Sequence, residues 1–116
     1  LNEAIMLEQE AKNFGMDVLV ETHTKEEIEM ANKLDTLLVG INNRNLKTME
    51  VDINNTIKLK SFINPDKIIV AESGLKNNLD LQILKENGIQ NFLIGESLMK
   101  EKDLTLATKK ILGLLN

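Results

Sequence analysis

The feature that most constrains the fold is the stretch at residues 68–74, which reads Ile-Ile-Val-Ala-Glu-Ser-Gly. Its opening apolar run is mostly β-branched and lies between Pro65 and Gly74, which is typical of a strand buried on both faces. Such strands belong to parallel sheets, in which functional groups gather at the carboxyl ends of the strands. Glu72, Ser73 and Gly74 therefore stand where a functional site is expected.

Three other short apolar runs share this form, at residues 18–21, 37–41 and 92–94. Each ends in, or is followed by, polar residues or glycine. Apolar residues at steps of three and four predict an amphipathic helix before the first strand and another after each strand. These helices are expected near residues 4–14, 24–34, 53–62, 77–87 and 104–114.

Residues with strong capping preferences mark the ends of these helices. The predicted N-caps are Thr24, in a capping box with Glu27, then Asp52, Asn77 or Asn78, and Asp103. The glycines predicted at the C-terminal ends are Gly15 and Gly88.

One leading helix followed by four strand-helix units predicts an α/β fold with a parallel sheet and right-handed connections. With 116 residues, 42% hydrophobic and 28% charged, the chain has the composition of a single globular domain. If the strands pair in sequence order, their carboxyl ends meet at one rim. We therefore expect residues far apart in the sequence to converge there.

A net charge of −4 and a pI near 5.0 argue against nucleic acid and membrane surfaces as partners. The chain has no cysteine, and no apolar run approaches the roughly 20 residues that span a bilayer, so a cytoplasmic protein is expected. His23 is the only histidine and is expected at a helix entry or on the surface rather than on a metal. Because the chain starts at Leu1 without a charged leader, it is expected to be the interior of a longer polypeptide.

Glu21, Asn42 and Glu72 are the candidate catalytic residues, each at the end of a predicted strand. A glutamate that ends an apolar strand is partly desolvated, which raises the carboxyl pKa and suits general acid or base catalysis. Either glutamate alone could instead cap its strand or pair with a lysine. Two glutamates with an asparagine between them favour a catalytic function.

Ser73, Gly74, Gly95 and Glu96 are candidate phosphate-binding residues at the last two strands. Backbone N–H groups before a helix or turn bind phosphate dianions, and the last two strands carry the phosphate site of β/α barrels. Each glycine alone could simply form a turn. Arg44 could hold a ligand carboxylate or be a solvated loop cation, and both alternatives stay open.

Four blocks of sequence resemble the indole-3-glycerol phosphate synthase family, whose fold is a TIM barrel. The blocks are Leu-Val-Glu-Thr-His at 19–23, Gly-Ile-Asn-Asn-Arg-Asn-Leu at 40–46, Val-Ala-Glu-Ser-Gly at 70–74 and Ile-Gly-Glu-Ser-Leu-Met at 94–99. The resemblance rests on the order and spacing of all four blocks, because any single block would be unspecific.

The resemblance implies a lyase of tryptophan biosynthesis, which closes the indole ring of 1-(2-carboxyphenylamino)-1-deoxyribulose 5-phosphate with loss of carbon dioxide and water. It implies that Glu21 is the general base, that Asn42 orients the substrate and that Glu72 is a third active-site residue. Arg44 matches a position near the anthranilate carboxylate. No cofactor is implied. The residues that match the phosphate-binding loops are Ser73, Gly74, Gly95 and Glu96, the last mainly through its backbone.

The resemblance covers only the fifth to eighth strand-helix units, so residues 1–116 are predicted to form one (β/α)4 half of a TIM barrel. In the family, the catalytic general-acid lysine, a phosphate-contacting lysine and a further glutamate lie in the other half. Lys25, Lys47 and Lys76 do not match the lysine positions. We therefore predict that the isolated chain is inactive, and that its open edges pair with an N-terminal half-barrel or with a second copy.

Two other functions stay open at this point. The chain could be a non-catalytic half-barrel that binds a phosphate or sugar phosphate, or that serves only as an assembly unit. It could also belong to another phosphate-binding barrel, because fold alone does not fix function. The block at residues 42–46 argues against the second alternative.

Overall fold

The computed structural model describes residues 1–114 as an α/β fold around one parallel sheet. The strands pair in sequence order, β1-β2-β3-β4, and all three pairings are parallel. Their bounds are β1 Leu19–Thr22, β2 Leu38–Asn42, β3 Ile68–Glu72 and β4 Asn91–Leu93. The parallel sheet expected from the four apolar runs is therefore confirmed.

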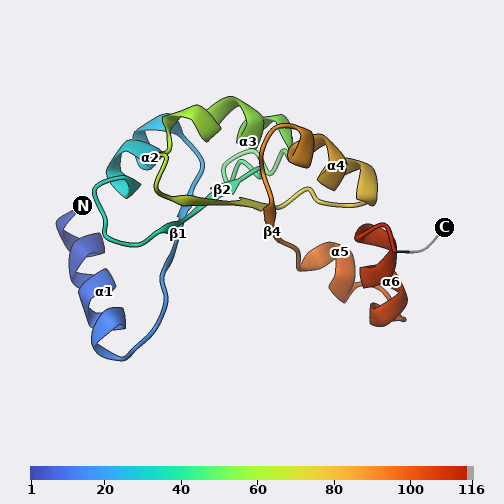
Figure 1. The fold of residues 1–116 in the computed structure, drawn as a ribbon, viewed down its shortest axis with the longest axis horizontal. Coiled ribbons are helices and arrows are strands. Elements are labelled where there is room, and N and C mark those ends of the chain that lie inside the picture. Colours follow the sequence, from blue (N-terminus) through green and yellow to red (C-terminus); the bar gives the residue numbers. More distant parts are fainter. Residues whose placement is uncertain (115–116) are drawn as a thin grey trace.

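Among residues 1–114, helices lie along one face of this sheet and leave the other uncovered (Figure 1). Figure 1 shows α2, α3 and α4 side by side along that face, with α1 beyond the β1 edge and α5 and α6 beyond the β4 edge. The helix bounds are α1 Asn2–Asn13, α2 Lys25–Ala31, α3 Asn54–Leu59, the 3-10 turn η1 Lys60–Phe62, α4 Asn78–Glu86, α5 Glu96–Met99 and α6 Leu104–Ile111.

Alternation along each strand separates a buried face from an open one. Val39, Ile41 and Ala71 point toward the helices and are fully buried in two apolar clusters that form the core. Leu19 and Ile68 occupy the other face, where both are in register with Leu38 of β2. They are 39% and 42% exposed. This second set defines what we call the open face of the sheet.

Three of the predicted helix caps are confirmed. The Thr24 hydroxyl accepts from the Glu27 backbone N–H in a complete capping box, and Asn77 forms a second box with Asp80. The Asp103 carboxylate accepts from the backbone N–H of Leu106. The glycines predicted at C-terminal helix ends, Gly15 and Gly88, both have the positive φ that favours glycine there.

The predicted cap at Asp52 is wrong by one residue. Ile53 takes the N-cap position of α3 and makes no side-chain cap, while the Asp52 carboxylate accepts from the N–H of Asn54 at 2.9 Å. The Asp52 backbone N–H donates to the Asn43 carbonyl at 3.0 Å, so Asp52 belongs to the loop before the helix. The helix predicted over residues 53–62 also divides, because its last turn is η1.

The carboxyl-terminal third departs most from the sequence-based expectation. The strand β4 covers Asn91–Leu93, one residue earlier than the predicted residues 92–94. Its last residue, Leu93, pairs with Glu72, the last residue of β3. The one-turn helix α5 was not expected; its last residue, Met99, donates to the Gly95 carbonyl at 2.8 Å. Leu114 lies beyond the end of α6 rather than within it.

Candidate active site

The candidate catalytic residues meet at the carboxyl ends of the strands, on the open face. Asn42 of β2 is in register with Glu72 of β3, and its side-chain amide donates to the Glu21 carboxylate at 2.7 Å. The Asn42 side-chain oxygen accepts from the Arg44 N–H at 2.9 Å, which fixes the orientation of the amide. Three residues that are distant in sequence thus form one polar group, as predicted for the rim.

Glu72 is the most perturbed titratable group of this site. Burial, with a smaller contribution from the negative charge of Glu21, raises the pKa of the Glu72 carboxyl from 4.5 to about 7. The residue is only 6% exposed, and its Oε2 atom has no hydrogen-bond partner among residues 1–114. A carboxyl with this pKa exchanges a proton near neutral pH, which is the property that general acid or base catalysis requires.

Gly40 makes the space that Glu72 occupies. A Cβ atom at Gly40 would lie 2.1 Å from Oε2 of Glu72, so any larger residue would displace the carboxylate. This glycine lies in β2, where it is in register with Glu21 of β1 and with Val70 of β3. Its function is therefore steric. An isolated glycine within an apolar run indicates the close approach of another group, but the sequence does not say that this group is Glu72.

Arg44 extends from the loop after β2 to the first residue of α5. One of its terminal nitrogens lies 3.2 Å from the Glu96 carboxylate, and the other donates to the Met49 carbonyl at 3.5 Å. The resemblance assigned Glu96 mainly a backbone contribution, and its side chain has this ion pair in addition. Sequence spacing could not reveal it, because the two residues are 52 positions apart.

Two consecutive residues with left-handed backbone conformations form the turn after β3. Ser73 has φ +67° and Gly74 has φ +73°. A Cβ atom on Gly74 would lie 2.4 Å from Val51, so glycine is required there by both conformation and space. Gly95, in contrast, has negative φ and open space around it.

A cleft of about 670 Å³ opens between these groups. Most of the predicted site residues line it, namely Glu21, Arg44, Glu72, Ser73, Gly74, Gly95 and Glu96. Asn42 lies behind the cleft and reaches it through Glu21. Two cations that the sequence analysis did not assign to the site, Lys76 and Lys100, also line it. Lys76 lies in the loop between β3 and α4, and Lys100 follows α5 directly. Such positions are shared with many surface lysines, so the sequence does not distinguish these two.

Within the part of the chain that the structure describes, no three His, Cys, Asp or Glu residues are grouped so that they could hold a metal ion. None of the helices described is both long and apolar enough to span a membrane. His23 lies at the entry to α2, where its Nδ1 atom is 2.7 Å from the Asn42 carbonyl.

A parallel α/β sheet with helices on one face and paired carboxylates at its strand ends defines part of a β/α-barrel protein with a rim site. The sequence profile of the indole-3-glycerol phosphate synthase family matches residues 2–111, and the chain belongs to this family. The family fold is a TIM barrel, of which this chain covers a part. The resemblance expected from four blocks of sequence is thereby confirmed.

Curated relatives support the same assignment and show how much of them the chain covers. An indole-3-glycerol phosphate synthase of Azospirillum brasilense is 46% identical over 111 residues, which are 96% of this chain and 42% of the relative. One from Legionella pneumophila strain Paris is 45% identical over 104 residues, 90% of this chain and 40% of the relative. One from Endomicrobium trichonymphae is 48% identical over 94 residues, which are 81% of this chain and 36% of the relative. The chain thus spans about two-fifths of the length of these relatives.

Proposed function

We propose that residues 1–116 are the C-terminal (β/α)4 half of an indole-3-glycerol phosphate synthase, a cytoplasmic lyase of tryptophan biosynthesis. The substrate would be 1-(2-carboxyphenylamino)-1-deoxyribulose 5-phosphate, which loses carbon dioxide and water as the indole ring closes. The single observation that supports this most is the contact of Asn42 with Glu21 beside Glu72, at the rim of a sheet from this family.

The chemistry divides between the two carboxylates. Glu21 would act as the general base, while Glu72, with a pKa of about 7, can hold or release a proton at neutral pH. Asn42 orients Glu21 through its amide and would orient the substrate through this contact. The buried, unpartnered oxygen of Glu72 would receive a cation or a proton donor when the barrel is complete.

The substrate's two anionic ends would bind to different groups that line the cleft. Ser73, Gly74 and Gly95 would hold the phosphate with backbone N–H groups, together with the backbone of Glu96. Arg44 would face the anthranilate carboxylate with the N–H donors that its contacts with Glu96 and Met49 leave free. The nearby Lys76 and Lys100 add positive charge to the phosphate side.

The chain by itself is expected to be inactive, because the catalytic lysines of the family lie in the half that these residues do not match. Adding the N-terminal part of the Azospirillum brasilense relative, which this chain does not cover, should restore formation of indole-glycerol phosphate. Replacing Glu21 by Gln in the same mixture should abolish that activity. Near-normal turnover by the isolated chain, or no turnover by the mixture, would contradict the proposal.

The lysines in the cleft favour one alternative, a non-catalytic module that binds phosphate or sugar phosphate. Titration of the chain with a non-reactive, phosphate-bearing substrate analogue distinguishes the candidates when it is combined with the assay above. Binding without activity in the mixture would support the module. Binding together with restored activity would support the enzyme.

A further inference from the structure

Asn43, next to the candidate catalytic asparagine, uses every polar group that it has. It is 2% exposed; its backbone N–H donates to the Glu72 carbonyl at 2.8 Å and its carbonyl accepts from Asp52 at 3.0 Å. Its side-chain amide donates to the Ser73 carbonyl at 3.1 Å. Its side-chain oxygen accepts from both the N–H and the hydroxyl of Thr56, at 3.1 and 2.8 Å.

These bonds connect the interior of α3 to the turn after β3. Thr56 lies in α3 and is completely buried. Its two hydrogen bonds to the side-chain oxygen of Asn43 therefore hold that side chain in one orientation. Asn43 in turn holds the carbonyl of Ser73, the residue that begins the left-handed turn. Asn43 itself does not line the cleft, whereas Ser73 and Gly74 do.

The turn needs such support because of its backbone conformation. Ser73 carries a Cβ atom and yet has φ +67°, a conformation that is strained in residues other than glycine. A strained turn keeps its shape only where surrounding contacts fix it. The side chain of Asn43 provides a direct bond to the strained residue, and Val51 packs against the following Gly74.

We propose that Asn43 is a positioning residue that fixes the turn of Ser73 and Gly74 and thereby the phosphate group of the ligand. This inference rests on the proposed function, because it assumes that the turn binds phosphate. Asn43 would act through the backbone of the turn without touching the ligand. Its loss should weaken the binding of phosphate more than it affects the chemical step.

The test compares Asn43→Ala with Thr56→Val in the full chain, using inorganic phosphate as the probe and NMR titration as the measurement. Asn43→Ala removes the bond to Ser73, and we expect about a tenfold loss of phosphate affinity because the N–H groups lose their alignment. Thr56→Val removes a buried hydrogen bond of the same network but leaves the bond to Ser73. Its phosphate affinity should stay within about twofold of the wild type.

Enzyme kinetics give a second readout in the mixture with the N-terminal part of the relative. Asn43→Ala should raise KM by about the same factor as it weakens phosphate binding, with a much smaller change in kcat. Urea denaturation of both variants measures the purely structural effect. If Asn43→Ala does not fold, Asn43→Ser replaces it with the same expectation, because its side chain is one bond shorter and cannot reach Thr56 and Ser73 together.

Three results would overturn the inference: wild-type phosphate affinity in the Asn43 variant, equal losses in both variants, or no phosphate binding by the wild type. The function proposed above is judged separately, by the activity of the wild-type mixture. A mixture without activity whose phosphate affinity still depends on Asn43 would contradict the enzyme and support the positioning function.

Discussion

At the scale of single residues, the environment of Glu72 follows from its neighbours in the sheet. Gly40 leaves room for the carboxylate, and Glu21 lies close enough to oppose its ionisation. The raised pKa makes the free energy of unfolding depend on pH. The folded protein keeps the proton up to about pH 7, whereas the unfolded chain releases it near 4.5. Stability should therefore fall as pH rises between these two values and level off above them.

Glu72→Gln should remove this pH dependence, because the amide cannot ionise. At pH 8 the variant should be more stable than the wild type by up to about 3 kcal/mol, with little difference at pH 4. Urea denaturation at both pH values measures the effect. As a control, Glu21→Gln removes the neighbouring charge and should lower the Glu72 pKa in part, because burial is the larger cause. Parallel stability curves for Glu72→Gln and the wild type would contradict the prediction.

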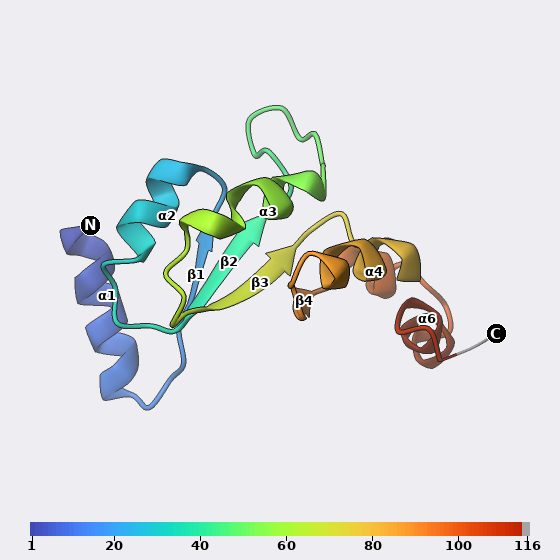
Figure 2. The ribbon, with the colours of Figure 1, turned by 45° about the horizontal axis from the view of Figure 1, so that its top comes forward.

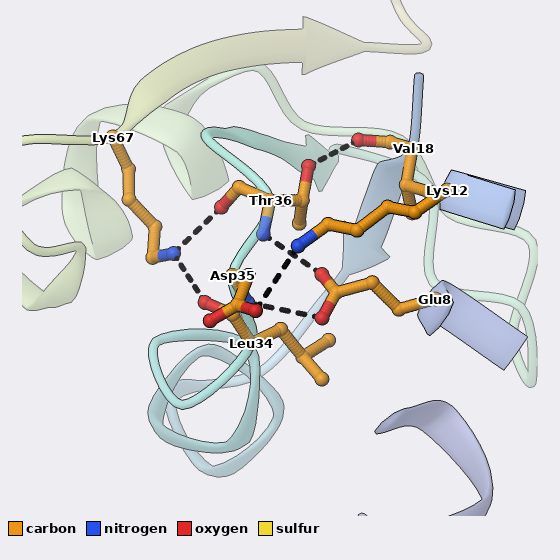
Figure 3. A network of polar contacts seen from close by, with 7 residues as sticks. All are labelled: Glu8, Lys12, Val18, Leu34, Asp35, Thr36 and Lys67. Atoms are coloured by element: carbon orange, nitrogen blue, oxygen red, sulfur yellow. Dashed lines mark hydrogen bonds and ion pairs between the residues drawn. The ribbon is translucent and has the colours of Figure 1, made fainter. Parts of the chain in front are cut away.

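At the scale of elements, α1 is held at the edge of the sheet by one buried carboxylate. Glu8 accepts from the backbone N–H groups of Asp35 and Thr36 at 3.0 and 2.8 Å (Figure 3). Lys67 donates to the carbonyls of Leu34 and Thr36 at the other side of the same segment. The contact substitutes for apolar packing, since the large apolar side chains of α1, Ile5, Met6 and Leu7, are exposed.

Glu8→Ala should therefore detach α1. It leaves two backbone N–H groups without acceptors, and we expect a loss of about 2 kcal/mol in the free energy of unfolding. The matched control is Lys12→Ala, which removes an exposed ion pair with Asp35 and should cost less than about 1 kcal/mol. Urea denaturation gives both values, and amide exchange at Thr36 should accelerate only in the Glu8 variant. Equal effects of the two substitutions would refute the expected function of Glu8.

At the scale of the whole molecule, the chain is extended in a way that an ordinary domain is not. Its radius of gyration is 15.2 Å, whereas a compact chain of this length has about 13 Å. Figure 2 shows the strands side by side with helices on one face, and Figure 1 shows the other face without cover. Leu93 continues the open face at the β4 edge and is 52% exposed. Large apolar side chains exposed together on one face are typical of a surface that contacts a partner.

The isolated chain should therefore associate, through the open face and the two edge strands. Ile68→Lys places a charge on the open face and should lower the mean mass measured by light scattering. Leu79→Lys changes an exposed apolar residue of α4, outside the open face, and should leave the mass unchanged. A monodisperse wild-type monomer with a cooperative melt would contradict this expectation.

Much of the fold could be predicted because it depends on neighbours along the chain. The continuous apolar run at residues 37–41 predicted the strand β2, and the capping residues Thr24, Asn77 and Asp103 located three helix starts. The helix after Asp52 was harder, because Asp52 is bonded to Asn43 in a loop whose path the sequence does not reveal. The short helix α5 has too few residues for a periodic pattern.

The sequence by itself determined which elements form and which residues end the strands, because strand and helix periods follow from local patterns. The alternation of strands with helices then predicted a parallel sheet whose strand ends share one rim. Only the tertiary structure decided how the rim residues act on one another. The pKa of Glu72, the ion pair of Arg44 with Glu96 and the link from Thr56 through Asn43 to Ser73 all join separate segments. Burial and distance between such segments depend on the packed chain, so no pattern along the sequence specifies them.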